Sequence, residues 1–360
     1  PKNTEVRVKV LRGGVPDLIE FKITRGKIPV YSLDAAYMAD KTTGYIKLNR
    51  FAASSADEFR EALEKLKKQG MKNLILDLQG NGGGYLNIAI DLADEFLGKD
   101  KLIVYTEGNK QPREEAKSSA RGGFEEGRLV VLVDETSASA SEILSGAVQD
   151  WDRGVVVGRR TFGKGLVQKP IPMPDGSMIR LTVARYYTPT GRSIQKPYVN
   201  GNQEQYNHDL IDRYNRGELM SADSIHFPDS MKYNTLETKR IVYGGGGIMP
   251  DIFIPRDTSG VTSYFSNVVN SGMLNLYALE YSDGNYDKLA SCKTYQDLHK
   301  YLQQQPLLSD FTNYAAAKGI KKRPHLINIS GKLIEKQIQA YIVRNFFDEA
   351  GFYPIFQNDD

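Results

Sequence analysis

The order of apolar and polar positions predicts strands that alternate with helices across the middle of the chain. Nearly continuous apolar runs, such as 73–78 and 128–133, are typical of strands buried on both faces. Apolar residues spaced three and four apart, as over 54–68, indicate amphipathic helices. The predicted strands are 44–48, 73–78, 102–105, 128–133 and 155–157, and the predicted helices are 54–68, 86–96 and 139–150. This alternation favours a mainly parallel sheet with helices on its faces.

The flanking regions carry other patterns. Apolar and polar residues alternate over 5–10 and 18–24, which predicts two strands and a chain that begins inside a β-rich unit. Strand-like segments at 166–173 and 178–184 enclose a Pro-Asp-Gly turn and predict a β-hairpin. Residues 197–235 are polar and weakly periodic, which is typical of an elaborated loop. The helices predicted after residue 258 lie at 262–280, 294–304, 307–318 and 330–349.

Composition limits the classes of function. Of the 360 residues, 40% are hydrophobic and 25% are charged, which is enough to build a sizeable core. A net charge of +3 gives little support to a nucleic-acid partner. The single cysteine, Cys292, excludes an internal disulfide and a multi-cysteine metal site, and no apolar run approaches the roughly 18 residues of a membrane span. We therefore expect no metal, no cofactor, no nucleic-acid partner and no membrane span in this chain.

A serine-rich segment, Thr136–Ile143, is the first candidate for chemistry. It follows the predicted strand 128–133 and opens the predicted helix 139–150, and ligands bind at that end of the strands in open α/β sheets. A serine at a helix N-terminus has free backbone N–H groups beside it, which can stabilise an oxyanion. The alternative is structural, because serine and threonine cap helices and small residues let a helix pack close to a sheet. From this segment alone, the structural role is at least as well supported.

The second candidate is Thr161–Gly165, in which Lys164 stands between two glycines. A lysine removed from water has a lowered pKa and can act as a general base at neutral pH, and serine–lysine pairs are a known variant of the catalytic triad. A lysine that acts in this way must be shielded from water, so we expect a largely dry site around Lys164. One alternative is a solvated lysine in a turn. Another is a phosphate-binding loop over 158–164, but that loop requires Ser or Thr where Gly165 stands.

A glycine cluster at 80–84, shortly after the predicted strand 73–78, is the third candidate. Glycines at this place let backbone N–H groups point at a substrate and complete an oxyanion hole with the amide of Ala140. The structural alternative is a tight strand-to-helix turn that requires positive φ angles. Other nucleophile systems find no support, because the sequence has no G-x-S-x-G or H-E-x-x-H motif and its four histidines lie far along the chain from the serines.

In order and spacing, these segments resemble the motifs of the C-terminal processing peptidases, also called tail-specific proteases, which are serine endopeptidases related in fold to ClpP and crotonase. Asp77–Gly84 resembles the family's D-L-R-x-N-x-G-G segment, although Gln79 stands where the family usually has Arg. The other matching segments are Ser137–Ile143 for S-A-S-A-S-E-I, Phe162–Gly165 with Gln168 for F-G-K-G and Q, and 244–251 for G-I-x-P-D. The resemblance covers residues 1–257.

The resemblance implies a role for each matching residue. Ser139 is the nucleophile, and Lys164, 25 residues later, is the general base that takes its proton. Gln168 orients the lysine amine. The backbone amides expected to form the oxyanion hole are those of Ala140 and of Gly82 or Gly83.

The expected fold class is α/β (α+β), with a ClpP/crotonase-like protease core over 29–257. The tail end of a PDZ-like module and a linker precede it over 1–28, and a helical region follows over 258–360. The expected function is a serine endopeptidase that cleaves proteins or peptides near their C-termini. The resemblance also implies a bacterial envelope location, in the periplasm, and is compatible with a homo-oligomer.

Two other functions compete with this one. The main alternative is a catalytically idle peptide-binding or scaffold protein on the same fold, although Ser139 and Lys164 are both present. A crotonase-type enzyme acting on acyl-CoA would use oxyanion amides without a serine–lysine pair, so the pair counts against it. The helical region 258–360 carries no motif, and buttressing of the core, dimerisation and steering of substrate are all open for it.

Overall fold

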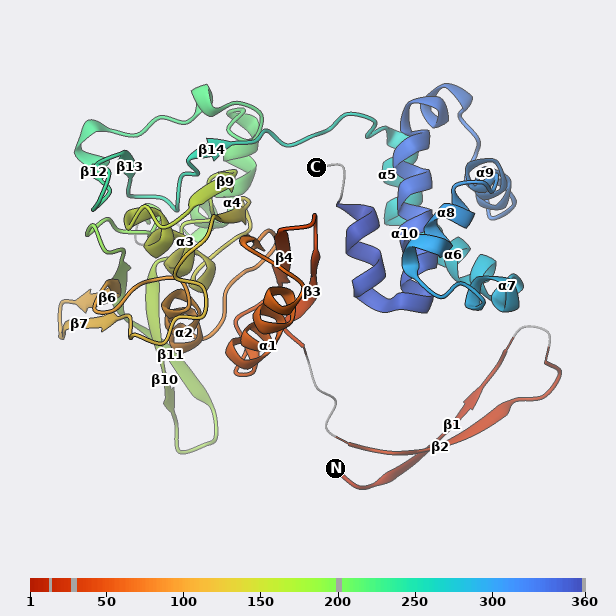
Figure 1. Cartoon of the computed structure of the whole chain (residues 1–360), viewed down its shortest axis with the longest axis horizontal. Coiled ribbons are helices and arrows are strands. Elements are labelled where there is room, and N and C mark those ends of the chain that lie inside the picture. Colours follow the sequence, from red (N-terminus) through yellow and green to blue (C-terminus); the bar gives the residue numbers. More distant parts are fainter. Residues whose placement is uncertain (13–14, 27–30, 199–202, 358–360) are drawn as a thin grey trace. The chain divides into compact units, whose positions relative to one another are not determined.

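The computed structural model describes residues 1–12, 15–26, 31–198 and 203–357. It divides into two compact units, 1–31 and 32–360. In its described part, the first unit contains an antiparallel hairpin of β1 (Glu5–Val10) and β2 (Ile19–Thr24), shown in Figure 1. Both strands predicted for that region are confirmed. A hairpin alone does not identify a PDZ-like module, so that assignment stays a prediction.

The second unit is built on a six-stranded sheet with the strand order β14–β9–β8–β5–β4–β3. All neighbouring strands pair in parallel except β3 and β4, which are antiparallel. The predicted mainly parallel sheet is therefore confirmed. Its strands are β3 (Leu33–Met38), β4 (Thr43–Leu48), β5 (Asn73–Asp77), β8 (Leu129–Val133), β9 (Val155–Gly158) and β14 (Ile252–Phe253).

Three helices pack through the apolar faces that the sequence predicted. α1 (Ser55–Lys68) buries Phe59 and Leu63 and contacts β3 and β4. α2 (Leu86–Asp94) packs against α3 (Ala140–Asp150), and α3 is buried along its whole length. Because α3 contacts both β9 of this sheet and β6 of a second sheet, small residues on it allow close packing on both sides.

The second sheet is antiparallel, with the strand order β10–β11–β6–β7. β10 and β11 form the predicted hairpin, and a register shift between Val167 and Gln168 marks a bulge near its start. β6 pairs antiparallel with β7 and β11, so it lies outside the parallel sheet. The strands are β6 (Leu102–Gly108), β7 (Gln111–Lys117), β10 (Leu166–Pro172) and β11 (Met178–Tyr187).

The segment 197–235, predicted as a loop, contains the helix α4 (Gln203–Asn215), so the prediction is wrong there. The anchor of α4 is polar: Arg213 is 1% exposed and donates a hydrogen bond to the carbonyl of Thr161 at 3.0 Å. A helix held by a buried arginine leaves little apolar periodicity in the sequence, which explains the miss. The other short elements are η1 (Ala222–Ser224), η2 (Asp229–Met231), β12 (Lys232–Asn234) and β13 (Ile241–Tyr243).

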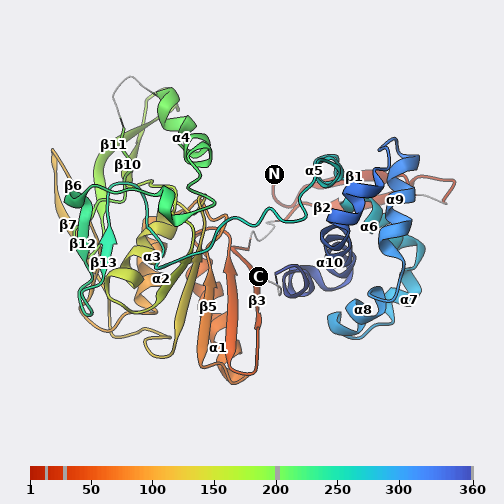
Figure 2. The same ribbon diagram turned by 90° about the horizontal axis from the view of Figure 1, so that it is seen from above.

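The region after residue 258 is helical, as predicted, and has a hydrophobic core of its own. Leu298, Phe311 and Ile338 are fully buried in that core. α10 contacts α5, α6, α8 and α9, which surround it in Figure 2. In the part of the chain that the structure describes, no helix combines the length and apolar character needed to cross a membrane. The helices are α5 (Ser263–Asn270), α6 (Met273–Gly284), α7 (Tyr286–Ala290), α8 (Tyr295–Leu302), α9 (Leu307–Ala317) and α10 (Pro324–Phe356).

The turn after α3 depends on the ionised carboxylate of Asp152. This carboxylate accepts the backbone N–H and the hydroxyl of Thr238 at 2.8 and 2.7 Å, and it pairs with Arg240 at 2.8 Å. Burial raises the pKa of Asp152, but these donors more than offset the rise and lower the pKa to about 2. A folded-state pKa below the ordinary value of 3.8 means that the contacts stabilise the fold above about pH 4. That stabilisation is lost as the pH falls toward 2.

We therefore expect Asp152→Asn to lower the free energy of unfolding at pH 7, by about 1 kcal/mol for the weakened hydrogen bonds. The difference from wild type should shrink as the pH falls, because protonation removes the same charge from wild-type Asp152. Urea unfolding of both proteins at pH 7, 4 and 2.5 measures the difference. A difference of equal size at all three pH values would contradict this role of the charge.

Candidate active site

Three loops at the carboxyl ends of parallel strands are joined by hydrogen bonds. They are the glycine loop (80–84) after β5, the serine loop (134–139) after β8 and the lysine loop (159–165) after β9. The backbone N–H of Ala138 donates to the carbonyl of Asn81 at 3.0 Å, and the N–H of Phe162 donates to the carbonyl of Ser137 at 3.0 Å. The structure thus brings together the three segments that the sequence singled out.

Asn81 fixes the shape of the glycine loop. Its buried side chain donates to the carbonyl of Leu48 at 2.9 Å and accepts the N–H of Gly83 at 2.9 Å. The amide of Gly83, one of the two glycines predicted to bind the oxyanion, is therefore already engaged. The amides of Gly82 and Ala140 meet no acceptor among the described residues. These two N–H groups have free hydrogen-bonding capacity, so Gly82 suits the predicted oxyanion hole better than Gly83 does.

Gly83 is packed directly against the serine loop. Its φ is +98°, and a Cβ atom there would lie 2.7 Å from the carbonyl oxygen of Ala138 and 2.8 Å from the Cβ of Ser139. Both the backbone conformation and this close approach require glycine. The predicted turn with positive φ therefore exists at this position, and it places the glycine loop in contact with Ser139.

Ser139 lies immediately before α3 and has an unusual backbone conformation. Its φ is +57° and its ψ is −111°, a region that costs a non-glycine residue on the order of 1–3 kcal/mol. Such strain persists only where surrounding contacts enforce it, and it clusters at active sites. The Ser139 side chain is half-buried. It stands at the N-terminus of α3, where the free N–H of Ala140 and the helix dipole favour negative charge.

The buried carboxylate of Glu142 holds the backbones of Ser139 and Lys164 close to each other. Its Oε2 accepts the N–H of Ser139 and the N–H of Lys164, both at 2.8 Å. Its Oε1 accepts the hydroxyl of Thr161 at 2.5 Å and the N–H of Gly163 at 2.6 Å. Burial raises the pKa of Glu142, and the four donated hydrogen bonds oppose that rise. One side chain thus joins the serine loop to the lysine loop.

The segment 244–251 also anchors the lysine loop. The hydroxyl of Thr161 accepts the N–H of Ile248 at 2.7 Å, and the N–H of Thr161 donates to the carbonyl of Ile248 at 3.1 Å. Further along, the carboxylate of Asp251 accepts the N–H of Val156 on β9 at 2.8 Å. This segment therefore ties the lysine loop to the edge of the parallel sheet.

The side chains of the predicted base and its orienting partner are not assembled around Ser139. Lys164 and Gln168 are both exposed, and no hydrogen bond among the described residues joins the side chains of Ser139, Lys164 and Gln168. The expectation of a largely dry site is therefore wrong for this structure. The reason is local, because the two glycines beside Lys164 have no side chains to cover it and Gln168 begins the exposed part of β10.

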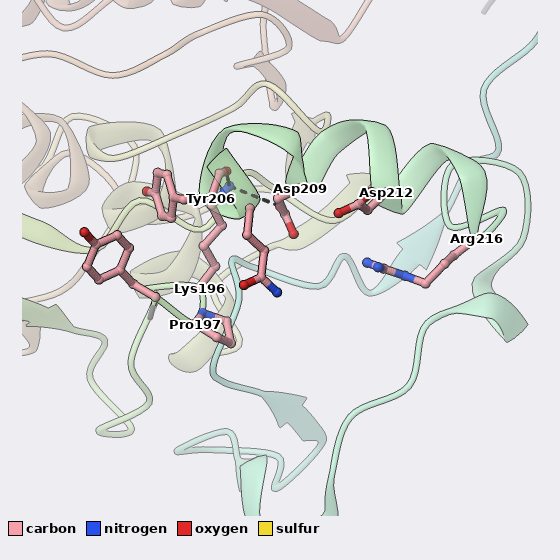
Figure 3. A pocket seen from close by; sticks show the side chains of 8 residues that line it. Lys196, Pro197, Tyr206, Asp209, Asp212 and Arg216 are labelled. Carbon is pink, nitrogen blue, oxygen red and sulfur yellow. Dashed lines mark hydrogen bonds and ion pairs between the residues drawn. The ribbon is translucent and has the colours of Figure 1, made fainter. Parts of the chain in front are cut away.

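A cavity of about 200 Å³ lies next to the lysine loop and α4 (Figure 3). Lys196 lines it, and the backbone N–H of Lys196 donates to the carbonyl of Gly163 at 2.9 Å. Its Nζ lies 4.0 Å from the ring centre of Phe162, 4.1 Å from that of Tyr206 and 3.2 Å from the carboxylate of Asp209. Burial lowers the pKa of Lys196, and Asp209 opposes this change. No sequence pattern singled out Lys196, because its aromatic neighbours come from separate segments of the chain.

Gln79 departs from the family pattern, and its neighbour Asp77 is paired with a lysine on another strand. The Nζ of Lys47 on β4 lies 3.0 Å from Oδ2 of the fully buried Asp77. The same Nζ donates to the carbonyl of Gln79 at 2.7 Å. The charge of Asp77 is therefore compensated without an arginine at position 79, as a buried carboxylate requires.

The family model described as peptidase family S41 matches residues 42–204, a range that contains all three loops. This region belongs to peptidase family S41. The S41 fold here has mixed α/β content and is followed by the C-terminal helices. Residues 264–348, within those helices, match a family of unknown function, DUF8443.

Two curated relatives of the S41 region are named "Carboxyl-terminal-processing protease". The one from Synechocystis sp. (strain PCC 6803) is 42% identical over 200 residues, which is 54% of this chain and 46% of the relative. The one from Picosynechococcus sp. (strain PCC 7002) is 43% identical over 178 residues, which is 49% of this chain and 42% of the relative. The chain thus spans less than half the length of these relatives.

One solved structure that aligns with the chain is titled a photosystem II D1 C-terminal processing protease. It is 25% identical to this chain, with a TM-score of 0.45. The alignment covers 71% of this chain and 56% of that one.

Proposed function

We propose that the chain is a serine endopeptidase that hydrolyses proteins or peptides near their C-termini, with Ser139 as the nucleophile and Lys164 as the general base. The observation that carries the proposal is the carboxylate of Glu142, which accepts the backbone N–H groups of both residues. It does so inside a peptidase family S41 region. The strained backbone of Ser139 supports the same conclusion.

The proposed chemistry uses residues of all three loops. The Oγ of Ser139 attacks the scissile carbonyl while the neutral amine of Lys164 takes the hydroxyl proton. The amides of Ala140 and Gly82 donate hydrogen bonds to the oxyanion. The C–N bond then breaks, the Lys164 ammonium gives its proton to the leaving amine, and an ester forms on Ser139. A water molecule, deprotonated by Lys164, hydrolyses that ester and restores the hydroxyl of Ser139.

In this scheme, a bound substrate shields the amine of Lys164 from water. Lys164 is exposed, and catalytic hydrogen bonds are often made only in the substrate complex. An extended peptide lying across the serine and lysine loops would exclude water from the amine and so favour its neutral form. Gln168, at the start of the β10–β11 hairpin, would then orient that amine. Gln168 is thus a positioning residue in this scheme.

The proposed partners are protein or peptide substrates. The names of the two curated relatives support cleavage at carboxyl termini. Nowhere in the described residues do three His, Cys, Asp or Glu side chains gather as a metal site would require, and the scheme above uses no metal or cofactor. A periplasmic location in a bacterial envelope and a homo-oligomer rest on the resemblance and are parts of the proposal.

One observation favours a second candidate, a catalytically idle peptide-binding protein on the same fold. The side chains of Ser139 and Lys164 are not hydrogen-bonded to each other in the described structure, and Lys164 is open to solvent. An idle protein would bind peptides in the same place and leave them intact. The two candidates differ only in turnover.

Cleavage of unfolded casein by the wild-type chain and by Ser139→Ala separates the two candidates. We expect the wild type to cleave casein and the variant to lose activity by at least roughly 10³-fold, with an unchanged circular dichroism spectrum. Equal cleavage by both proteins would contradict the role of Ser139. Binding of casein without cleavage by the wild type would favour the idle protein.

A further inference from the structure

A buried charge cluster stands directly before the glycine loop. Oδ1 of Asp77 accepts the N–H of Gln79 at 2.7 Å, and Oδ2 lies 2.5 Å from the hydroxyl of Tyr45 and 3.0 Å from Nζ of Lys47. Asp77 is fully buried, and Tyr45 and Lys47 are nearly so. The backbone position of Gln79, and with it the start of the glycine loop, therefore depends on this cluster.

Gln357, the residue directly after α10, contacts the cluster from far along the chain. The side chain of Gln357 hydrogen-bonds the hydroxyl of Tyr45, and its Nε2 lies 3.4 Å from Oδ2 of Asp77. One turn earlier, the hydroxyl of Tyr353 donates to Oδ2 of Asp34 on β3 at 2.9 Å. Burial and the Asp34 carboxylate raise the pKa of Tyr353, which keeps this hydroxyl protonated as a donor.

The contacts of Tyr353 and Gln357 involve the ends of β4 and β5, the two strands that hold the glycine loop. Asp77 is the last residue of β5, and Asp34 also accepts a hydrogen bond from the side chain of Asn49, directly after β4. Two residues further on, Phe51 donates its N–H to the carbonyl of Gly83 at 3.1 Å. The end of α10 is thus connected to the glycine loop through the end of β4 and through the end of β5.

A bend in α10 makes these contacts possible. Asp348 has φ +51° and ψ −154°, which is not helical and is strained for a non-glycine residue. Tight packing fixes the segment after the bend, because a Cβ atom at Gly351 would lie 2.8 Å from side-chain atoms of Val343 and of Phe347. Ile355 is 5% exposed, within the helical core. The segment 349–357 is therefore held by the helical core while it contacts β3, β4 and β5.

We propose that residues 349–357 position the glycine loop of the S41 site, so that the helical region controls catalysis from within the same chain. This inference rests on the proposed function. Tyr353 and Gln357 touch no reacting atom and are positioning residues. They hold the ends of β4 and β5. The ends of these strands determine the position of the Gly82 amide and the contact of Gly83 with Ser139.

The test compares the whole 360-residue chain with a double variant, Tyr353→Phe with Gln357→Met, which removes both polar contacts at nearly constant volume. Tyr341→Phe is the matched control, because Tyr341 lies on α10 before the bend and its hydroxyl has no hydrogen-bond partner among the described residues. The first readout is hydrogen exchange at the amides of Gly83 and Tyr85, which are hydrogen-bonded in the structure. The second is kcat and KM for a peptide substrate, measured well below each Tm.

We expect faster exchange at these amides in the double variant and a kcat lowered roughly 5- to 30-fold with KM unchanged, the usual size of a coupling between sites. Tyr341→Phe should match the wild type in both readouts. A purely structural role would lower Tm but leave the exchange and the kcat of the folded double variant unchanged, and that result would overturn the proposal. If exchange accelerates but the wild type hydrolyses no peptide, the coupling stands and the proposed function fails.

Discussion

Lys164→Ala is expected to slow peptide hydrolysis by roughly 10²- to 10⁴-fold, the range that a general base contributes. The free energy of unfolding should change by less than about 0.5 kcal/mol, because the removed side chain is exposed and its backbone N–H still reaches Glu142. A large loss of activity without loss of stability is the signature of a residue that acts on the reaction. Initial rates with a fluorogenic peptide and urea unfolding of the same samples measure the two quantities.

Lys169→Ala is the matched control for this prediction. Lys169 is an exposed lysine five residues further along, on β10, the strand that follows the lysine loop, and its amine contacts Gln111 outside the three loops. Its truncation removes the same charge from the same part of the molecule. We expect its rate to stay within about threefold of the wild type, since surface substitutions of this kind are mild. Equal rates for Lys164→Ala and Lys169→Ala would remove Lys164 from the mechanism.

The second large effect is expected for Gly83→Ala. The new Cβ atom would meet the carbonyl of Ala138 at 2.7 Å, the Cβ of Ser139 at 2.8 Å and the amide nitrogen of Ala140 at 3.0 Å, so backbone atoms must shift. The loop would move away from the nucleophile and from the free amide of Ala140. We expect kcat/KM to fall by roughly 10²- to 10³-fold, as when one oxyanion donor is lost.

Substitutions at two other glycines of the same loop distinguish the effect of backbone strain from the effect of the steric clash. Gly80 also has a positive φ, +75°, but a Cβ atom there meets nothing within 4 Å, so Gly80→Ala tests backbone strain without a clash. Gly82 has neither the positive φ nor a close neighbour, and Gly82→Ala keeps the amide that we assign to the oxyanion. We expect Gly82→Ala to keep the most activity, Gly80→Ala to keep less and Gly83→Ala to keep the least. Equal activity of all three variants would contradict the contact between Gly83 and Ser139 as the cause.

Local sequence signals predicted the parts of the site that depend on local structure. The apolar runs of β5 and β8 were visible because strands covered on both faces need apolar side chains at nearly every position. Loops at the ends of such strands meet at one edge of the sheet, so the serine, lysine and glycine segments could be expected to come together. The positive φ of Gly83 followed from the cluster of glycines.

Contacts between distant segments were not predictable from local patterns. Glu142 is an acidic residue in the first turn of α3, and only the fold places Lys164 and Thr161 on its carboxylate. α4 was missed because a buried arginine, not an apolar face, anchors it. Gln357 lies 280 residues from Asp77 along the chain, and no periodicity or motif links the two. The exposure of Lys164 was among the alternatives that the sequence left open, because the two glycines beside it suit both a catalytic lysine and a solvated lysine in a turn.

The central claim is that Ser139 is a nucleophile activated by Lys164, and covalent labelling tests it without the need for a known substrate. The wild-type chain, Lys164→Ala and Ser139→Ala would each be treated with a fluorophosphonate, digested and examined by mass spectrometry. We expect the adduct on Ser139 in the wild type, much slower labelling in Lys164→Ala and none in Ser139→Ala. A wild-type chain that stays unlabelled, or that is labelled at a different serine, would contradict the account.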